Sequence, residues 1–189
     1  MHAVDLREAP AGLVCTGDGS RVSLRPVRPS DAALVQQFVR GLSPASRRRR
    51  FFSAVSELSP EQLDRMTHLE PPDGLALAAT CAGASPRIVG IAQYALSGPA
   101  YAEMAIAVAD DWQRRGLGES LLVALLDHAA RSGITTAHGL VLAENWPMVM
   151  LAAKLGFSVS EHADERLLSI EKRLISRHAA TCRPAAVAA

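Results

Sequence analysis

Aromatic residues and net charge are both scarce in this sequence. Tryptophan, tyrosine and phenylalanine account for 4% of the 189 residues, whereas hydrophobic residues account for 49%. We therefore expect one domain whose core is aliphatic and rich in alanine. Twenty basic and nineteen acidic residues leave a formal charge of +1. A dedicated nucleic-acid-binding protein usually has a basic excess on one face, so the composition argues against nucleic acid as a partner.

Cysteine-based sites and long apolar segments are also missing. The three cysteines, Cys15, Cys81 and Cys182, lie far apart and form no C-x-x-C or Cys/His spacing, so we expect no metal site. A sparse, odd number of cysteines is typical of a reducing compartment. No apolar run approaches the roughly 18 residues of a membrane-spanning helix, and the N-terminal residues lack the apolar centre of a signal peptide. We therefore expect a cytoplasmic protein without a membrane partner.

The order of the expected strands and helices indicates a mixed α/β (α+β) fold. Residues 1–20 are expected to form an N-terminal extension with one hairpin strand, residues 21–174 a single domain, and residues 175–189 a disordered tail. Helical segments come first within the domain, and a strand–helix–strand unit follows, which requires a parallel strand pair. We expect a mixed, mostly antiparallel sheet of six to seven strands with one parallel pair, flanked by about four helices.

Local signals place the main elements. Ser59 and Gln62 have the spacing of a helix N-cap and its capping box, with Pro60 at the first helical position. Apolar residues recur from Leu117 to Ala129 at helical spacing, which predicts a helix with one buried face. Strands are expected near residues 75–81, 87–96, 101–109, 135–143, 157–162 and 165–174.

A turn rich in glycine and arginine precedes the helix that begins at Leu117. The turn reads Gln-Arg-Arg-Gly-Leu-Gly over residues 113–118. Free N–H groups gather where a helix begins, the helix dipole adds positive charge, and glycine allows close approach of a ligand. The chain has no GxxxxGK[ST] string, and the third glycine of a GxGxxG fingerprint is replaced by Leu121. The turn predicts a pyrophosphate site of the Q/R-x-x-G-x-G/A type found in acyl-CoA enzymes, with an ordinary strand-to-helix turn as the alternative.

Four segments together resemble a known family. "VADDWQRRGLGESLL" resembles motif A of the GNAT superfamily of N-acetyltransferases, and "NWPMVMLAAKLGF" resembles its motif B. "LRPVRPSDAALVQQFVRGLSPASRRRRFF" and "LSPEQLDRMTH" resemble the acetyltransferase domain of bacterial Pat-type protein lysine acetyltransferases. The resemblance covers residues 21–174 and implies the GNAT fold, with a splayed parallel strand pair. It also implies acetyl-CoA as co-substrate and transfer of the acetyl group to a primary amine.

The resemblance leaves the acceptor and the assembly open. A protein lysine side chain is the favoured acceptor, and a small-molecule amine is the alternative. A non-catalytic module that senses acyl-CoA is an alternative of a different class. The oligomeric state, monomer or dimer, is not fixed.

The resemblance implies binding roles for individual residues. Ala107 and Val108 are expected to pair with the pantetheine arm, and a backbone N–H near Val108 to hold the thioester oxygen. Asn145 is expected to contact the same arm. The pyrophosphate is expected to lie against the turn and the start of the helix, with contacts from Gln113, Arg114, Arg115, Gly116, Leu117, Gly118, Glu119 and Ser120.

Glu103 is the expected general base, because Pat-type enzymes carry their catalytic glutamate at this place in the strand. A lysine amine has a pKa of about 10.4 and a glutamate about 4.3, so direct proton transfer is unfavourable. We expect partial burial to raise the pKa of Glu103, which then acts through a water molecule. A solvated charge at the strand end is the alternative. Ala152 stands where many family members have the tyrosine that protonates the leaving thiolate.

A run of four arginines, residues 47–50, precedes Phe51 and Phe52. We expect a helix that buries both phenylalanines and leaves the arginines in solvent. Contact with nucleic acid or with an acidic substrate is the alternative. In the family this segment borders the acceptor site, which favours the substrate among the functional interpretations.

Overall fold

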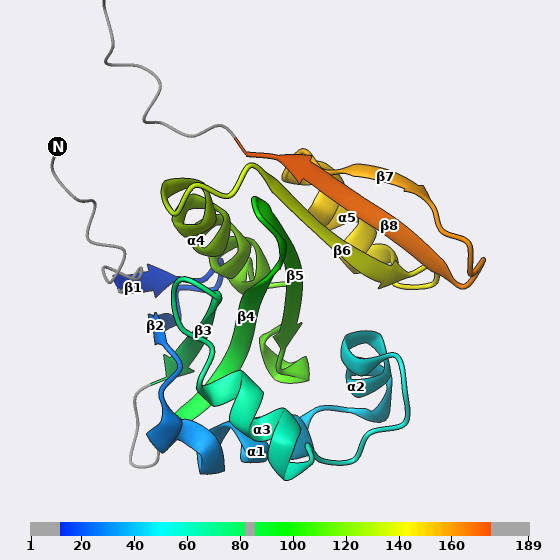
Figure 1. Ribbon diagram of the computed structural model, residues 1–189. Coiled ribbons are helices and arrows are strands. Elements are labelled where there is room, and N and C mark those ends of the chain that lie inside the picture. Colours follow the sequence, from blue (N-terminus) through cyan, green and yellow to red (C-terminus); the bar gives the residue numbers. More distant parts are fainter. Residues whose placement is uncertain (1–11, 82–85, 175–189) are drawn as a thin grey trace, which may run out of the picture.

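An eight-stranded sheet forms the centre of the computed structural model, which describes residues 12–81 and 86–174 (Figure 1). Its spatial order is β1-β2-β3-β4-β5-β6-β8-β7, and every neighbouring pair is antiparallel except β5 and β6. This confirms the predicted mixed, mostly antiparallel sheet, and the strand count exceeds the expected six to seven. The strands are β1 (Gly12–Cys15), β2 (Arg21–Pro26), β3 (Gly74–Cys81), β4 (Arg87–Gly98), β5 (Tyr101–Val108), β6 (Thr136–Leu142), β7 (Ser158–Glu161) and β8 (Leu167–Arg173).

Five α-helices and two short 3-10 helices occur within the described residues. In the chain order they are η1 (Pro29–Asp31), α1 (Ala32–Gly41), α2 (Pro44–Phe51), α3 (Pro60–Thr67), η2 (Asp110–Trp112), α4 (Leu117–Arg131) and α5 (Trp146–Lys154). The predicted capping box at the start of α3 is present, because Ser59 accepts from the Gln62 N–H and the Gln62 side chain accepts from the Ser59 N–H. None of these helices is long and apolar enough to cross a membrane.

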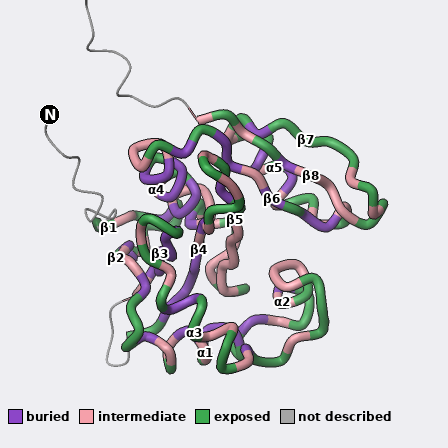
Figure 2. Tube along the Cα trace, in the orientation of Figure 1, coloured by how far each residue is buried: buried purple, intermediate pink, exposed green. Residues whose placement is uncertain are grey.

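The two faces of the sheet carry separate hydrophobic cores. The first core packs the apolar face of α4, including Leu117, Leu121 and Leu125, against the strands, and α5 adds to it. The second core lies under α1 and α3 on the opposite face. Figure 2 shows buried residues along β3, β4 and the inner face of α4. Alternate residues of β5 therefore face different cores: Ala102 and Met104 point toward α4, and Ala107 points toward the second core.

Strands β5 and β6 form a fork. They pair over only three residues, where Tyr101, Ala102 and Glu103 lie opposite Thr136–His138. Beyond this point β5 stays on β4 as far as Val108, and β6 stays on β8, so the two strands separate (Figure 1). A splayed parallel pair was expected, and it is present. The fork leaves backbone groups of β5 without a strand partner on one side.

The N-terminal hairpin belongs to the sheet. β1 pairs along its whole length with β2, and the turn between them lies at residues 16–20. The predicted hairpin is therefore confirmed over the residues that the structure describes. The remainder of the N-terminal extension, residues 1–11, and the predicted disordered tail, residues 175–189, lie outside the described residues.

Candidate active site

A cavity of about 640 Å³ opens in the fork between β5 and β6. Its walls come from the second half of β5, the end of β6, the starts of α4 and α5, and the C-terminal half of α2. A volume of this size falls within the range of small-molecule sites, about 300–1,000 Å³. We call it the fork cavity. Among the predicted site residues, Glu103, Gln113 and Asn145 line it together with the β5 and glycine-turn residues Ala107, Val108, Arg114, Gly116, Gly118 and Glu119.

The backbone of β5 presents a donor to the fork cavity. The Ala109 N–H donates to the Val89 carbonyl of β4 at 2.9 Å. Hydrogen-bonding directions alternate along an antiparallel strand, so the Val108 N–H points away from β4 and toward the fork. By the same alternation the backbone groups of Ala107 point toward β4, so of these two residues Val108 is the one that presents its backbone to the fork.

The glycine turn brings unsatisfied backbone donors to one end of the same cavity. Gly116 is the N-cap of α4, with φ of +83°, and no side chain caps the helix. The first-turn N–H groups of α4 therefore have no side-chain acceptor within the described residues. The side chain of Leu117 is 1% exposed and packs in the first core, so only its backbone is available to a ligand. Such a helix start suits a phosphate ligand.

The side chain of Gln113 holds the glycine turn against two neighbouring elements. Its amide nitrogen donates to the Val108 carbonyl at 3.0 Å and to the Ser46 hydroxyl at 3.1 Å. Gln113 therefore fixes the turn relative to β5 and α2, although it also lines the fork cavity.

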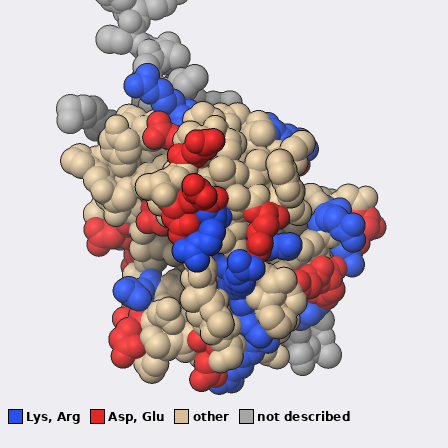
Figure 3. Space-filling view, turned by 90° about the vertical axis from the view of Figure 1, so that its right-hand side faces the viewer, with Lys and Arg blue, Asp and Glu red and all other residues tan. Residues whose placement is uncertain are grey.

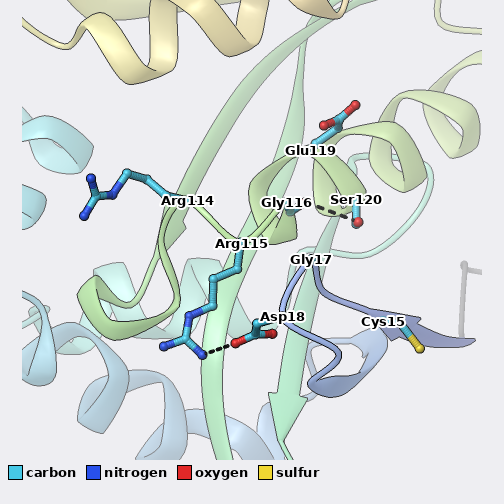
Figure 4. Close-up of a pocket in the computed structure, with 8 residues that line it drawn as sticks. All are labelled: Cys15, Gly17, Asp18, Arg114, Arg115, Gly116, Glu119 and Ser120. Carbon is cyan, nitrogen blue, oxygen red and sulfur yellow. Dashed lines mark hydrogen bonds and ion pairs between the residues drawn. The ribbon is translucent and has the colours of Figure 1, made fainter.

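The two arginines of the turn have different surroundings. Arg115 forms an ion pair with Asp18 of the β1–β2 turn at 2.6 Å and lies over the Trp112 ring, 5.3 Å from its centre. The backbone joins the same two turns, since the Gly17 N–H donates to the Arg115 carbonyl at 2.8 Å. Arg114 points away from Asp18 (Figure 4) and has no ion pair within the described residues. It is therefore the arginine of the turn that is free for a ligand.

A second hollow lies on the outer side of the turn. It measures about 570 Å³, and the residues lining it include Asp18, Arg114 and Ser120 (Figure 4). Hydrogen bonds from Thr16 and from the Ser20 N–H, together with the charge of Arg115, lower the pKa of Asp18 to about 2. The carboxylate is therefore ionised at neutral pH and offsets the charge of Arg115.

The remaining predicted binding residues border the two helix starts. Glu119 forms an ion pair with Lys154 at 2.6 Å, which links α4 to the end of α5. The Ser120 hydroxyl donates to the Gly116 carbonyl at 3.3 Å, within the turn. Asn145 is the N-cap residue of α5, and its carbonyl accepts from the Met148 N–H at 2.9 Å. Its position places a polar side chain at the fork cavity opposite β5.

Glu103 lines the fork cavity but is exposed, so the expected partial burial is wrong. The reason is its place in the sheet. Glu103 is the last residue of β5 that pairs with β6, and it lies between Ala95 on β4 and His138 on β6. The His138 ring is hydrogen-bonded to Ser97 at 2.7 Å, and the Glu103 carboxylate stays exposed beside it. Any desolvation of Glu103 has to come from bound substrates.

The expected orientation of the arginine run is also wrong. Helix α2 ends at Phe52 in the left-handed conformation, with φ of +57°, and Phe52 is 45% exposed at the fork cavity. Phe51 is partly buried against the second core. Arg49 and Arg50 line the fork cavity and do not simply point into solvent. The short helix presents its C-terminal residues to the cavity, which the sequence pattern did not indicate.

Asp110 fixes the position of α2. Its carboxylate accepts from the Ser43 N–H at 2.8 Å and from the Ser43 and Ser46 hydroxyls at 2.7 Å each. Desolvation alone would raise the pKa of Asp110, but these hydrogen bonds outweigh it and lower the pKa. The contact ties the N-terminus of α2 to η2, directly before the glycine turn. Sequence reasoning missed it because no motif connects these positions.

No tyrosine lines the fork cavity. The chain has two tyrosines, and both are described. Tyr94 is 1% exposed and hydrogen-bonded to His128 at 3.1 Å, and Tyr101 is exposed at the start of β5. Ala152 is fully buried in the first core and does not line the cavity. The chain therefore supplies no phenol to the site.

Comparisons with known proteins agree with this geometry. A family model described as an acetyltransferase (GNAT) domain matches residues 21–158. An acetyltransferase from Pseudomonas aeruginosa is 34% identical over 150 residues, which cover 78% of this chain and 81% of that protein. The GNAT domain of S. lividans PAT has a TM-score of 0.81 and 26% identity, covering 92% of this chain and 100% of that chain.

A further solved structure is similar in fold. The Salmonella typhimurium protein yncA, solved with its cofactor acetyl-CoA, has a TM-score of 0.67 and 19% identity, covering 82% of this chain and 94% of that chain. The match of the family model includes the fork and the glycine turn, and the predicted resemblance is confirmed. The chain belongs to the GNAT family of acetyltransferases, which are acyltransferase enzymes.

Proposed function

We propose that the chain transfers an acetyl group from acetyl-CoA to a protein lysine side chain, with Glu103 as the general base. The observation that carries the proposal is the composition of the fork cavity. One cavity joins the free edge of β5, the uncapped start of α4 and the carboxylate of Glu103. These are the parts needed to hold an acyl-CoA and to accept a proton from an amine.

The residues present fit acetyl-CoA, the co-substrate that GNAT enzymes use. The N-terminal N–H groups of α4 and the guanidinium of Arg114 suit the pyrophosphate. The Val108 N–H and the side chain of Asn145 face the fork, where the pantetheine arm would lie. Bound acetyl-CoA supplies the thioester carbonyl that the amine attacks. The Val108 N–H would donate to the oxygen of that carbonyl as negative charge develops on it.

Proton transfer is the role of Glu103. The acceptor enters as an ammonium and has to lose a proton before it can attack. Glu103 would take that proton through a water molecule, which bridges an exposed carboxylate to an amine. No phenol lines the cavity, so water would return a proton to the departing thiolate. A CoA thiolate is a stable leaving group, and its protonation does not require a dedicated side chain.

Protein lysine is the proposed acceptor on two grounds. The N-terminal helices resemble those of Pat-type enzymes, and the solved GNAT domain of S. lividans PAT covers 92% of this chain. Glu103 also lines the fork cavity and remains exposed, so the end of a long side chain has access to its carboxylate.

The test uses labelled acetyl-CoA and a cell extract separated into protein and small-molecule fractions. We expect label on protein lysines with the native chain and its loss with Glu103→Gln, while CoA binding measured by calorimetry is retained. Glu161→Gln is the matched control, because Glu161 is an exposed strand carboxylate on β7 outside the cavity. Label confined to small amines would overturn the proposed acceptor. CoA binding without label in either fraction would indicate an acyl-CoA sensor.

A further inference from the structure

We infer that the acceptor carries a carboxylate close to its reactive amine, and that Arg49 and Arg50 of α2 bind this carboxylate. The inference rests on the proposed function, since it names the acceptor class for the same cavity. It concerns the wall of the fork cavity that α2 and Glu103 of β5 form. That wall contains Glu103, which would receive the amine, and the two arginines.

Two of the four arginines of α2 are bonded to other groups of the chain, and the other two face the fork cavity. Arg47 donates to the carbonyl of Leu42 at 2.7 Å, and Arg48 forms an ion pair with Glu144 at 2.8 Å. Arg49 and Arg50 line the fork cavity and have neither a hydrogen bond nor an ion pair within the described residues. The available pair is thus the pair that faces the cavity.

Arg50 is the stronger anchor of the two. Burial lowers the pKa of Arg50 to about 10, and the charge of Glu103 offsets this effect only in part. The guanidinium remains positive at neutral pH, yet it has lost much of its hydration. It also lies over the Phe51 ring, 4.9 Å from the ring centre, which leaves its edge donors free. A desolvated guanidinium without a hydrogen-bonded partner is costly, and a bidentate carboxylate removes that cost.

The arginines are held in place before any ligand binds. Ser46, one turn before Arg50, is 7% exposed and is bonded to both Asp110 and Gln113. The end of α2 is therefore fixed relative to the glycine turn and β5. Figure 3 shows basic side chains gathered on the lower middle of the face that α2 occupies, with acidic side chains around them. A fixed positive group requires less reorganisation when an anion binds.

Two charges of opposite sign in one cavity select an acceptor with the complementary pair. The ammonium of the acceptor is attracted to Glu103, and its carboxylate to Arg49 and Arg50. Two sources offer this chemistry: a lysine with a neighbouring Asp or Glu in a peptide, and a small amino acid with its own carboxylate. The phosphates of acetyl-CoA are the competing anion, and their proposed site is Arg114 and the start of α4, on elements other than α2.

The experiment compares acceptors that differ only in charge. Initial rates are measured at saturating acetyl-CoA with short peptides that contain one lysine flanked by glutamate, by glutamine or by arginine. Free lysine and lysine amide form the small-molecule arm. We expect kcat/KM for the glutamate-flanked peptide, or for free lysine, to exceed that of the neutral counterpart by about tenfold, as for one hydrogen-bonded charge pair. The arm that shows the preference identifies the source.

Substitutions of the arginines test whether they cause the preference for an acidic acceptor. Arg50→Gln is expected to raise KM for the acidic acceptor by about tenfold, because a guanidinium–carboxylate bond is lost. Arg49→Gln is expected to raise it by about threefold for the same reason. KM for the neutral acceptor and KM for acetyl-CoA should stay unchanged. Arg48→Gln is the matched control, since it removes the same charge from the same helix outside the cavity lining. Arg50→Lys should retain part of the preference.

Three results would overturn the inference. Equal rates on acidic and neutral acceptors in both arms would show that no carboxylate is recognised. A loss in Arg50→Gln that is equal for acidic and neutral acceptors would indicate a structural role. A raised KM for acetyl-CoA would assign the arginine to the co-substrate. Failure of the proposed function is distinguishable, because then the native chain acetylates no peptide, acidic or neutral.

Discussion

Asp18 and Arg115 form an ion pair at 2.6 Å, although 97 residues separate them in the sequence. The pair joins the turn of the N-terminal hairpin to the glycine turn that precedes α4. The two arginines of that turn are therefore not equivalent. Arg115 is neutralised by a carboxylate of the chain, whereas Arg114 lies between the two cavities without such a partner.

The first prediction follows from this difference. Arg114→Gln should weaken CoA binding by about tenfold, because a charge-assisted hydrogen bond to phosphate is lost. Arg115→Gln should weaken it by less than about threefold, since the charge of Arg115 is already offset by Asp18. Titration calorimetry with CoA at constant salt measures both. Equal losses in the two variants would contradict the assignment.

The second prediction concerns the glycine that begins α4. Gly116 has φ of +83°, and a Cβ there would meet nothing within 4 Å. Gly116→Ala should therefore cost only the backbone strain of the left-handed conformation, about 1–2 kcal/mol of unfolding free energy. It should also weaken CoA binding, because relief of the strain displaces the N–H groups of the turn.

Gly133 provides the matched control for this change. It has φ of +86° and equally open surroundings, but it lies beyond the C-terminus of α4. Gly133→Ala should lower the stability by a similar amount and leave the CoA affinity unchanged. Denaturant unfolding and calorimetry on the two variants separate the effects. A parallel loss of CoA affinity in both would show that stability alone governs binding.

The sequence predicted those features that depend on neighbouring residues. The helical spacing of apolar residues from Leu117 to Ala129 predicted α4, because one stripe of leucines is enough to bury a helix face. The capping box at Ser59 and Gln62 gave the start of α3. The parallel strand pair followed from the order of the elements, since a helix between two strands allows them to run in the same direction.

The features that the sequence did not reveal depend on contacts between distant segments. Ser43 and Asp110 are 67 residues apart, and neither stands in a motif that indicates the other. The arrangement of Arg49 and Arg50 at the cavity depends on that contact, because it sets the direction of α2. The exposure of Glu103 depends on its place at the last paired position between β5 and β6. Such features require the folded chain, because residue spacing carries no information about them.

The third prediction tests the anchor of α2. Asp110→Asn keeps one acceptor oxygen but replaces the other with an NH2 donor and removes the charge that serves three donors. We expect KM for the acceptor to rise several-fold, because the end of α2 is then less firmly held. KM for acetyl-CoA should change less, since Gln113 still bonds to the Val108 carbonyl. Steady-state kinetics with each substrate varied in turn measures both, and an effect confined to acetyl-CoA would contradict the prediction.

The fourth prediction is a pH dependence of stability that does not involve the active site. Asp31 is 5% exposed and accepts two hydrogen bonds from Arg25, at 2.6 and 2.8 Å. The Arg25 guanidinium, together with the Arg28 N–H, holds the pKa of Asp31 below its usual value, although desolvation opposes this. A carboxyl whose pKa is lower in the folded state stabilises the fold above its unfolded-state pKa of about 3.9. This stabilisation disappears as the pH falls below that value and through the lowered folded-state pKa.

Asp31→Asn should therefore remove about 2 kcal/mol of unfolding free energy at pH 7, the scale of hydrogen bonds to a charged group. The difference between the native chain and the variant should shrink as the pH falls below about 4, because the native carboxyl then becomes protonated. Urea unfolding at a series of pH values measures the difference. Asp127→Asn is the control, since its ion pair with Arg131 is largely exposed and such pairs contribute about 0–1 kcal/mol. A difference at Asp31 that stays constant between pH 7 and pH 3 would show that packing, and not the charge, accounts for the loss.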